Sequence, residues 1–192
     1  MRKACFAVVV AGAVVTLLCA AARADDTVRQ PGSHPPYGLE LEPHGTYGWG
    51  AAYGGEGGFG VGVLFAIPVV RNGFIPAIDD SVAIAFALDW VHYDYCYWAP
   101  MGCNGDYVDL SVTLQWNFYV SQRWSVFGEP GLMLYHGFFD DCPPGSECPG
   151  QPVGTGVYPV LFLGGRYHLN DTMALTLRIG FPTFSFGFSF FL

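Results

Sequence analysis

Lysine is almost absent from this chain of 192 residues, in which Lys3 is the only one. Charged residues make up only 12% of the sequence, whereas apolar residues make up 52%. A soluble domain usually stays in solution through a surface of mixed charge that includes lysine. The acidic balance and the lack of a basic cluster also argue against a nucleic-acid-binding protein. The composition therefore indicates a protein with a largely apolar surface.

The longest apolar run in the chain directly follows two basic residues. Arg2 and Lys3 precede this run, which ends in the small-x-small sequence Ala22-Arg23-Ala24. This is the layout of a secretory signal peptide, and an uncleaved membrane anchor fits less well because the run is short and rich in alanine. We therefore expect residues 1–24 to be removed. The remaining 168 of the 192 residues then carry 5 arginines and all 16 carboxylates, a net charge of −11.

Apolar and polar residues alternate along most of the remaining chain. Successive side chains of a strand point to opposite faces, so this alternation predicts strands with one apolar face. The clearest segment runs from Val108 to Val120, with seven apolar positions opposing six mostly polar ones. Turn-forming residues divide the alternation into eight predicted strands. These strands are expected at residues 39–49, 59–70, 82–95, 108–120, 124–139, 156–168, 173–179 and 183–192.

The connections between the predicted strands differ in kind. Those after the second, fourth and sixth strands are short or plain, whereas those after the third and fifth contain cysteines and most of the Gly and Pro. Membrane barrels show this asymmetry, with short periplasmic turns and longer external loops. We therefore predict an all-β protein, an eight-stranded antiparallel up-and-down transmembrane β-barrel over residues 38–192. Residues 25–37, which contain Pro and Gly, are expected to form a flexible periplasmic lead-in.

The last ten residues are expected to form a strand with one strongly apolar face. Large apolar side chains alternate there with small ones, and no residue is charged. A soluble protein could bury such a face under a second sheet, but an uncharged strand at the end of the chain suits a barrel wall that faces lipid. The large side chains of this strand are Phe184, Phe186, Phe188, Phe190 and Leu192.

Four cysteines remain after cleavage, at positions 96, 103, 142 and 148. An even number in an exported chain predicts disulfides, and four cysteines admit three connectivities. We favour Cys96 with Cys103 and Cys142 with Cys148, because each pair brackets a Gly- and Pro-containing loop. A metal site is the alternative, but the spacings are not C-x-x-C and neither loop contains histidine. We therefore expect no metal and no cofactor.

Several charged residues occupy strand positions that face the lumen of the predicted barrel. An eight-stranded barrel is just wide enough for its own side chains to fill it, and buried charges must pair. We expect these residues to form a structural polar plug, although the excess of carboxylates could leave a narrow path for cations. The predicted network consists of Glu40, Glu42, Asp89, Asp109, Glu129, Arg166 and Arg178.

Over nearly its whole mature length the chain resembles the small eight-stranded outer-membrane barrels of Gram-negative bacteria. The resemblance rests on the strand pattern, and its most specific part is the alternation from Phe184 to Leu192, which looks like the signal read by the outer-membrane assembly machinery. That family usually ends in an aromatic residue, so Leu192 departs from it. The resemblance implies an outer-membrane location, with membrane lipids, the barrel assembly machinery and an extracellular ligand or surface as partners.

Some eight-stranded barrels are enzymes that act on lipid A. A hydrolase of that kind would need a serine, a histidine and a carboxylate that converge on one face near the outer leaflet. The sequence contains no His-x-Ser pair, which would place both residues on the same face of a strand. We therefore expect a non-enzymatic barrel with a structural or surface-recognition role through its external loops. The alternatives are a lipid A-modifying enzyme and a secreted soluble barrel that binds an apolar ligand.

Overall fold

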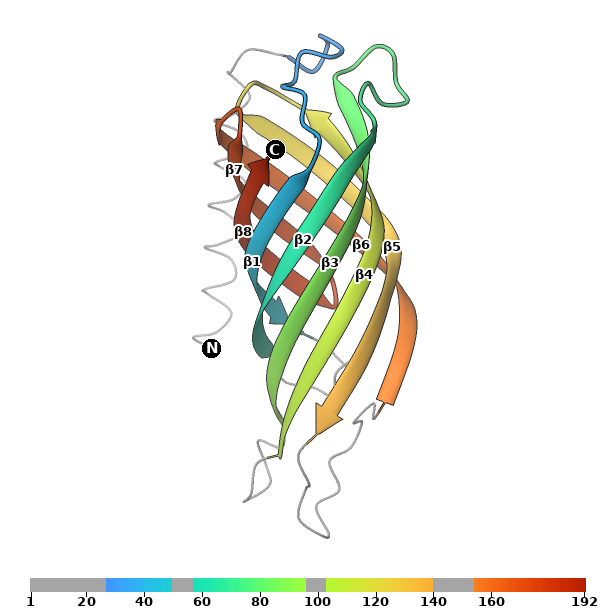
Figure 1. Ribbon diagram of the computed structural model, residues 1–192, viewed down its shortest axis with the longest axis vertical. Coiled ribbons are helices and arrows are strands. Elements are labelled where there is room, and N and C mark those ends of the chain that lie inside the picture. Colours follow the sequence, from blue (N-terminus) through green and yellow to red (C-terminus); the bar gives the residue numbers. More distant parts are fainter. Residues whose placement is uncertain (1–26, 50–56, 96–102, 140–153) are drawn as a thin grey trace, which may run out of the picture.

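A computed structural model describes residues 27–49, 57–95, 103–139 and 154–192, which form a closed antiparallel barrel (Figure 1). Each strand pairs with the next one along the chain, and β8 pairs with β1 to close the wall. This confirms the predicted eight-stranded up-and-down barrel. Among the described residues, no helix is long and apolar enough to cross a membrane. The strands are β1 (Glu40–Gly48), β2 (Gly58–Val70), β3 (Asp80–Tyr95), β4 (Cys103–Tyr119), β5 (Trp124–Phe139), β6 (Gly154–Asn170), β7 (Met173–Phe181) and β8 (Thr183–Phe191).

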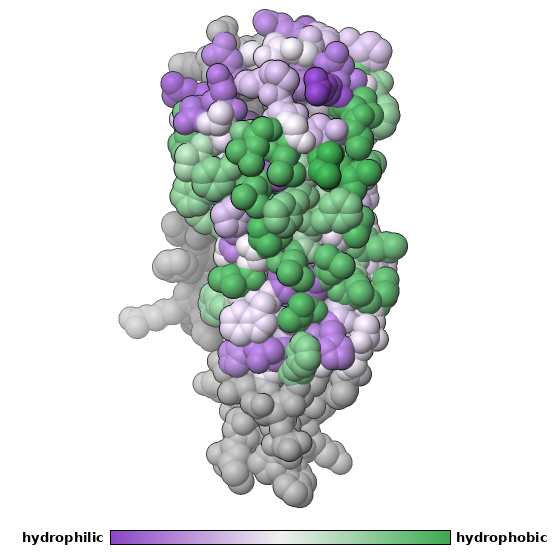
Figure 2. Space-filling model, viewed as in Figure 1, coloured by the Kyte–Doolittle hydropathy of each residue, from purple (hydrophilic) through white to green (hydrophobic). Residues whose placement is uncertain are grey.

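Side chains alternate between the lumen and the outer wall along the strands. In β8, Ser185 and Ser189 are buried, whereas Phe186 and Phe188 are 48% and 41% exposed on the outside. Figure 2 shows the consequence on one face, a band of apolar residues around the middle with hydrophilic residues toward both described ends. A bilayer requires an apolar outer surface and a backbone whose polar groups pair within a closed sheet. The wall is therefore built to span a membrane.

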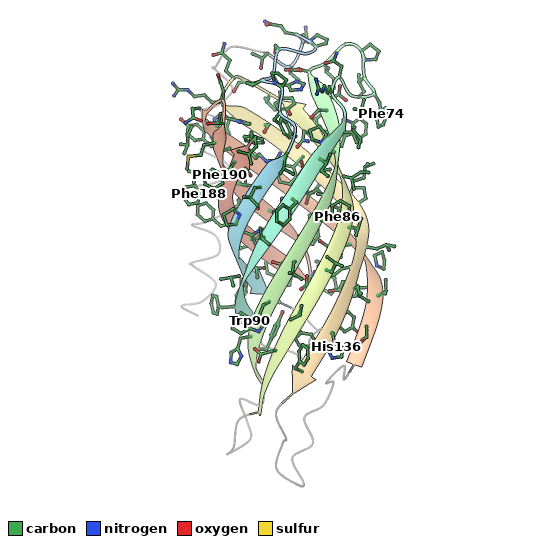
Figure 3. All side chains as sticks on the ribbon, viewed as in Figure 1. Phe74, Phe86, Trp90, His136, Phe188 and Phe190 are labelled. Atoms are coloured by element: carbon green, nitrogen blue, oxygen red, sulfur yellow. The ribbon has the colours of Figure 1, made fainter. Side chains whose placement is uncertain are left out.

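Aromatic and imidazole side chains flank the apolar band. Figure 3 shows Phe74 on the outside near one end of the barrel, and Trp90 and His136 on the outside toward the other end. Phe74 meets Trp116 edge-on, with 5.9 Å between the ring centroids. His136 meets Phe138 edge-on, with 4.6 Å between the centroids. Amphipathic rings favour the boundary between membrane and water, so these two groups mark the two boundaries.

The wall is uneven at the end that carries the long loops. Strands β3 to β6 contain 16 or 17 residues each, whereas β1, β7 and β8 contain 9. Pro182 alone connects β7 to β8, and its carbonyl accepts a hydrogen bond from Trp49 N at 2.8 Å. The wall is therefore lower on the side of β7, β8 and β1, while β3 to β6 extend further toward the loops (Figure 1).

Residues 27–37 are held against the opposite end of the barrel, where the connections are short. Asp79, in the connection between β2 and β3, is completely buried. Its carboxylate accepts hydrogen bonds from Gly32 N at 2.9 Å and Ser33 Oγ at 2.8 Å, and it lies 2.6 Å from His34 Nδ1. The buried Asp79 carboxylate therefore contacts polar groups of three residues in the segment before β1.

Two ring contacts also attach this segment to the barrel wall. The His34 ring stacks on Tyr119 with 4.1 Å between centroids, and Tyr37 meets Phe191 edge-on at 5.0 Å. Burial raises the pKa of the Tyr37 phenol far above its usual range, so it stays protonated. These contacts and Asp79 attach the described part of the predicted lead-in, residues 27–37, to the barrel, and its flexibility stays a prediction.

Several strand bounds differ from the predicted ones, although the number and order agree. β4 begins at Cys103 rather than at 108, and β6 spans Gly154–Asn170 rather than 156–168. These hairpins continue beyond the clear alternation, because backbone pairing does not require it. The signal peptide and the cysteines at 96, 142 and 148 lie outside the described residues, as does the side chain of the cysteine at 103. The signal peptide and both disulfide pairings stay predictions.

Candidate functional site in the barrel lumen

Arg178 on β7 binds two carboxylates that come from opposite walls of the barrel. Its Nε donates to Glu129 Oε2 on β5, and its Nη1 donates to Glu42 Oε1 on β1, each at 2.7 Å. All three side chains are at most 6% exposed. Gln115 Nε2 on β4 adds a hydrogen bond to Glu129 Oε1 at 2.6 Å. Buried charges are tolerated when they are paired and hydrogen-bonded, and this cluster meets both conditions.

Arg166 on β6 forms a second cluster next to the first, nearer the short-turn end of the barrel. Its Nη2 donates to Glu40 Oε2 on β1 at 2.9 Å, and its Nη1 donates to Asn117 Oδ1 on β4 at 2.6 Å. The Phe127 ring lies under the guanidinium, with 4.2 Å between Cζ and the ring centroid. A guanidinium favours such planar stacking together with forked hydrogen bonds. The two arginines thus connect strands from all around the lumen.

A histidine and an aspartate meet on the loop side of the arginine clusters. His44 Nε2 on β1 lies 2.7 Å from Asp89 Oδ1 on β3, and His44 Nδ1 lies 3.2 Å from the carbonyl oxygen of Glu42. β2 runs between the two strands, and Gly62 is its residue at this level. A Cβ atom on Gly62 would clash with both side chains. The glycine therefore provides the space in which the pair can form across β2.

Asp109 lies directly opposite Asp89 in the pairing of β3 with β4. The Asp109 side chain points into the lumen and is only 1% exposed. Neither of its carboxylate oxygens has a hydrogen-bond partner among the described residues. The loop-side half of the lumen therefore contains two facing carboxylates, one paired with His44 and one without a described partner.

Two cavities lie among the described lumen residues. One, of about 20 Å³, lies beside Arg178, Glu129 and His44, and it has room for about one water molecule. A larger cavity of about 410 Å³ lies at the short-turn end, beneath residues 27–37. It is lined by polar residues that include His34, Asp79, His168 and Asn170. The cavity beside Arg178 is thus much smaller than the one at the short-turn end.

The seven predicted lumen residues all face the interior, and hydrogen bonds or ion pairs connect six of them, all except Asp109. Asn117 and Gln115 link Arg166 to Glu129. His44 links Glu42 to Asp89, at 3.6 Å from Glu42 Oε1 and 2.7 Å from Asp89 Oδ1. Glu40, Glu42 and Glu129 pair with the two arginines, whereas Asp89 and Asp109 do not. The prediction omitted His44, Gln115 and Asn117, which complete the clusters. His44 has the strand parity of Glu42 on β1, and Gln115 and Asn117 have the parity of Asp109 on β4, so parity alone could have included them.

A serine and a histidine meet near the short-turn end of the barrel. Ser125 Oγ on β5 lies 3.0 Å from His168 Nε2 on β6. Ser125 is completely buried, so no substrate reaches its hydroxyl in this conformation. The pair also lies at the end opposite the long loops, far from an outer leaflet on the loop side. Among the described residues, no group of three His, Cys, Asp or Glu side chains could hold a metal ion.

The terminal strand occupies the seam that closes the barrel. β8 pairs with β7 on one side and with β1 on the other. Leu192 continues this pairing, because its amide donates to Leu39 O at 2.8 Å and its carbonyl accepts from Leu39 N at 3.1 Å. The outward Leu192 side chain is 68% exposed. The alternation noted in the sequence therefore lies on the outer wall, where a membrane or an assembly factor would meet it.

The chain is similar in fold to solved structures of bacterial outer-membrane and surface proteins. The chain is similar to OprG of Pseudomonas aeruginosa with a TM-score of 0.54 and 11% identity, over 83% of this chain and 98% of that one. For Neisserial surface protein A the TM-score is 0.53 and the identity 14%, over 80% and 97%. For Ail of Yersinia pestis, in complex with the heparin analogue sucrose octasulfate, the values are 0.48 and 14%, over 79% and 95%.

At sequence identities this low, the similarity to these structures shows only that they share a fold with this chain. No protein-family model matches the sequence, and no curated protein matches it significantly. The resemblance to small eight-stranded outer-membrane barrels is confirmed at the level of architecture. Together with the apolar band on the outer wall, these neighbours support an outer-membrane location.

Proposed function

We propose that this chain is a non-enzymatic outer-membrane barrel with a lumen closed by its own side chains. The observation that supports this proposal is the pair of arginine clusters. Arg166 and Arg178 reach from β6 and β7 to carboxylates on β1 and β5, so they cross the lumen. An eight-stranded wall leaves an interior only wide enough for side chains. Such an interior leaves the external loops as the part of the protein that acts on its surroundings.

The external loops are acidic, which suggests the chemistry of a partner. Residues 49–57, 96–102 and 140–153 contain 4 carboxylates and no lysine or arginine. We propose that these loops are constrained by the Cys96–Cys103 and Cys142–Cys148 disulfides and recognise a cationic extracellular partner. Complementary charge steers such encounters and selects against anionic partners.

Planar-bilayer recordings of the purified full chain test the closed lumen. We expect no steady conductance from the wild-type barrel, because the arginine clusters leave space for about one water molecule beside them. A wide-pore porin inserted under the same conditions is the control. Reproducible single-channel steps from the wild-type chain would contradict the closed lumen.

Binding of polylysine to proteoliposomes tests the acidic loops. The variant Glu56→Gln, Asp140→Asn, Asp141→Asn, Glu147→Gln removes their negative charge, and we expect it to lose most of the binding at low salt. Asp25→Asn with Asp26→Asn, ahead of the barrel, provides the control. Equal binding by the loop variant and the wild type would contradict a cationic partner.

Two further measurements separate this proposal from its alternatives. Membrane fractionation with heat-modifiable gel mobility should recover the chain in the outer membrane, and recovery in the soluble fraction would favour a secreted barrel. Mass spectrometry of lipid A should show the same profile with and without the protein. A changed profile would favour a lipid A-modifying enzyme.

We also propose that β8 is the segment that the barrel assembly machinery recognises. Its outward phenylalanines lie on the seam between β8 and β1. The variant Leu192→Phe tests this, because it restores an aromatic residue at the end of the strand. We expect faster conversion to the heat-modifiable form in cells and an unchanged rate of folding into pure lipid vesicles. Equal effects in both systems would contradict recognition by the machinery.

A further inference from the structure

The dipeptide Glu-Pro occurs at matching places in two strands. Glu42-Pro43 lies in β1 and Glu129-Pro130 lies in β5. In each case the glutamate is buried in the lumen and the proline is exposed on the outer wall. Proline has no N–H group, so it cannot donate the hydrogen bond that a strand residue normally gives to its neighbour.

Both prolines coincide with an interruption of the strand pairing. Between β1 and β8 the pairing includes Leu41 with Phe190, skips the Glu42-Pro43 dipeptide and resumes at His44 with Gly187. The register is the same on both sides of the gap, so the strands remain side by side. The seam between β1 and β8 thus lacks backbone pairing at this level.

The seam between β4 and β5 is interrupted in the same way. Its pairing includes Thr113 with Gly131, skips Glu129 and Pro130, and resumes at Trp116 with Gly128. In a barrel of eight strands the β8–β1 seam and the β4–β5 seam lie opposite each other. The two gaps therefore divide the wall into one half of β1 to β4 and another of β5 to β8.

Side chains cross both seams at the level of the gaps. Ser189 Oγ on β8 donates to Glu42 Oε2 on β1 at 3.2 Å. Gln115 Nε2 on β4 donates to Glu129 Oε1 on β5 at 2.6 Å. Arg178 on β7 binds both of these glutamates, so it connects the two crossing points through the lumen.

We propose that the barrel consists of two four-stranded halves that are latched to each other at mid-height by Arg178. In this device the guanidinium and the two glutamates replace the backbone hydrogen bonds that the prolines remove. Release of Arg178 lets both seams separate locally, while the rest of the wall stays paired. This latch is a property of the barrel wall and goes beyond the proposed closed lumen. The lumen can be closed whether or not Arg178 holds the two halves together, and the reverse is also true.

Hydrogen–deuterium exchange of the full chain in nanodiscs tests the latch. The variant Arg178→Gln should speed exchange about tenfold or more in segments 112–116 and 186–190, which flank the two gaps. Segment 83–87 of β3, which is paired on both sides, should change much less. Uniform acceleration around the barrel would overturn the proposal.

Restoring the missing N–H groups provides a second, independent readout. In the background Pro43→Ala, Pro130→Ala the backbone can pair across both seams, so Arg178→Gln should accelerate exchange there far less than in the wild type. An equal effect of Arg178→Gln in both backgrounds would overturn the latch, because a merely structural arginine does not depend on the prolines.

A milder pair of variants serves if Arg178→Gln does not fold. Ser189→Ala removes the side-chain bridge across the β8–β1 seam, and we expect faster exchange at 186–190 but not at 112–116. Ser185→Ala is the matched control, since Ser185 accepts from Arg178 Nη1 at 3.3 Å within the same half of the barrel. Equal effects of the two serine variants would overturn the proposal.

Discussion

Along the barrel axis, the lumen has a half toward the short turns and a half toward the long loops, and buried ionisable residues have different partners in the two. From mid-height toward the short turns, Arg166 and Arg178 hold three glutamates at hydrogen-bond distance. Nearer the loops, Asp89 and Asp109 face each other. His44 lies 2.7 Å from Asp89 and 3.6 Å from Glu42, whereas Asp109 has no described hydrogen-bond partner. One half therefore pairs its carboxylates with arginines, while the other contains a buried carboxyl group without a described partner.

This difference shows that an eight-stranded barrel does not need a uniform interior. Removing one member of a buried ion pair lowers the free energy of unfolding strongly, because the other member stays buried and unpaired. An unpaired carboxylate is instead a local cost that the rest of the wall must offset. Removing a partner from a paired group should therefore lower the free energy of unfolding, whereas replacing the carboxyl group of Asp109 should raise it.

Arg178→Met should produce the largest effect. It leaves Glu42 and Glu129 without their cation, and we expect the free energy of unfolding to fall by about 3–5 kcal/mol. Urea titration of the barrel in lipid vesicles, followed by gel mobility, measures this. The control is Arg71→Met in the exposed β2–β3 connection, which should change stability by less than about 0.5 kcal/mol. Similar losses in both variants would remove the distinction between buried and exposed arginines.

Gly62→Ala should have the next largest effect, in the loop-side half. The added methyl group collides with His44 and Asp89 and forces the pair apart, so we expect a loss of about 1–3 kcal/mol. The same titration measures it. Gly128→Ala is the control, because a Cβ there meets only Leu163 Cδ2 at 3.8 Å. A cost at Gly128 equal to that at Gly62 would contradict the role of Gly62 as a spacer.

Asp109→Asn should stabilise the barrel, in contrast to the other lumen substitutions. It replaces a buried carboxyl group whose oxygens have no described partner, and we expect a gain of about 1 kcal/mol. Asp89→Asn breaks the contact with His44 and should destabilise the barrel. If both variants shift the urea midpoint in the same direction, the contact with His44 does not distinguish Asp89 from Asp109 in its effect on stability.

Ser125→Ala should have the smallest effect. It removes one neutral hydrogen bond to His168, which contributes about 1 kcal/mol. The change should be several times smaller than that of Arg178→Met in the same half of the lumen, and lipid A should be unaffected. A loss of more than about 3 kcal/mol would place Ser125 on a level with the ion pairs.

Strand parity predicts which residues face the lumen, because it is a local property of the backbone. Glu42 and Arg178 could be assigned in this way from the sequence alone. Their pairing could not, since the two residues are 136 positions apart and meet only through the stagger of the whole barrel. The contact of His44 with Asp89 depends in addition on the small size of Gly62.

The segment before β1 shows a different limit of sequence reasoning. Its Pro and Gly residues predict flexibility, and nothing local indicates its acceptor. Asp79 lies in a connection, where parity does not fix the direction of a side chain, and it is 45 residues away from His34. The attachment of this segment therefore depends on a contact that only the folded barrel creates.

The length of the Arg178 side chain also limits the diameter of the barrel. Its guanidinium binds glutamates on β1 and on β5, which lie on opposite sides of the lumen. The distance between these two strands at this level therefore cannot exceed what one arginine and two glutamate side chains can span. The diameter of a barrel grows with the number of its strands. Inserting one more hairpin into this wall would carry β1 and β5 beyond the reach of a single side chain, which ties the strand number of this protein to the length of one residue.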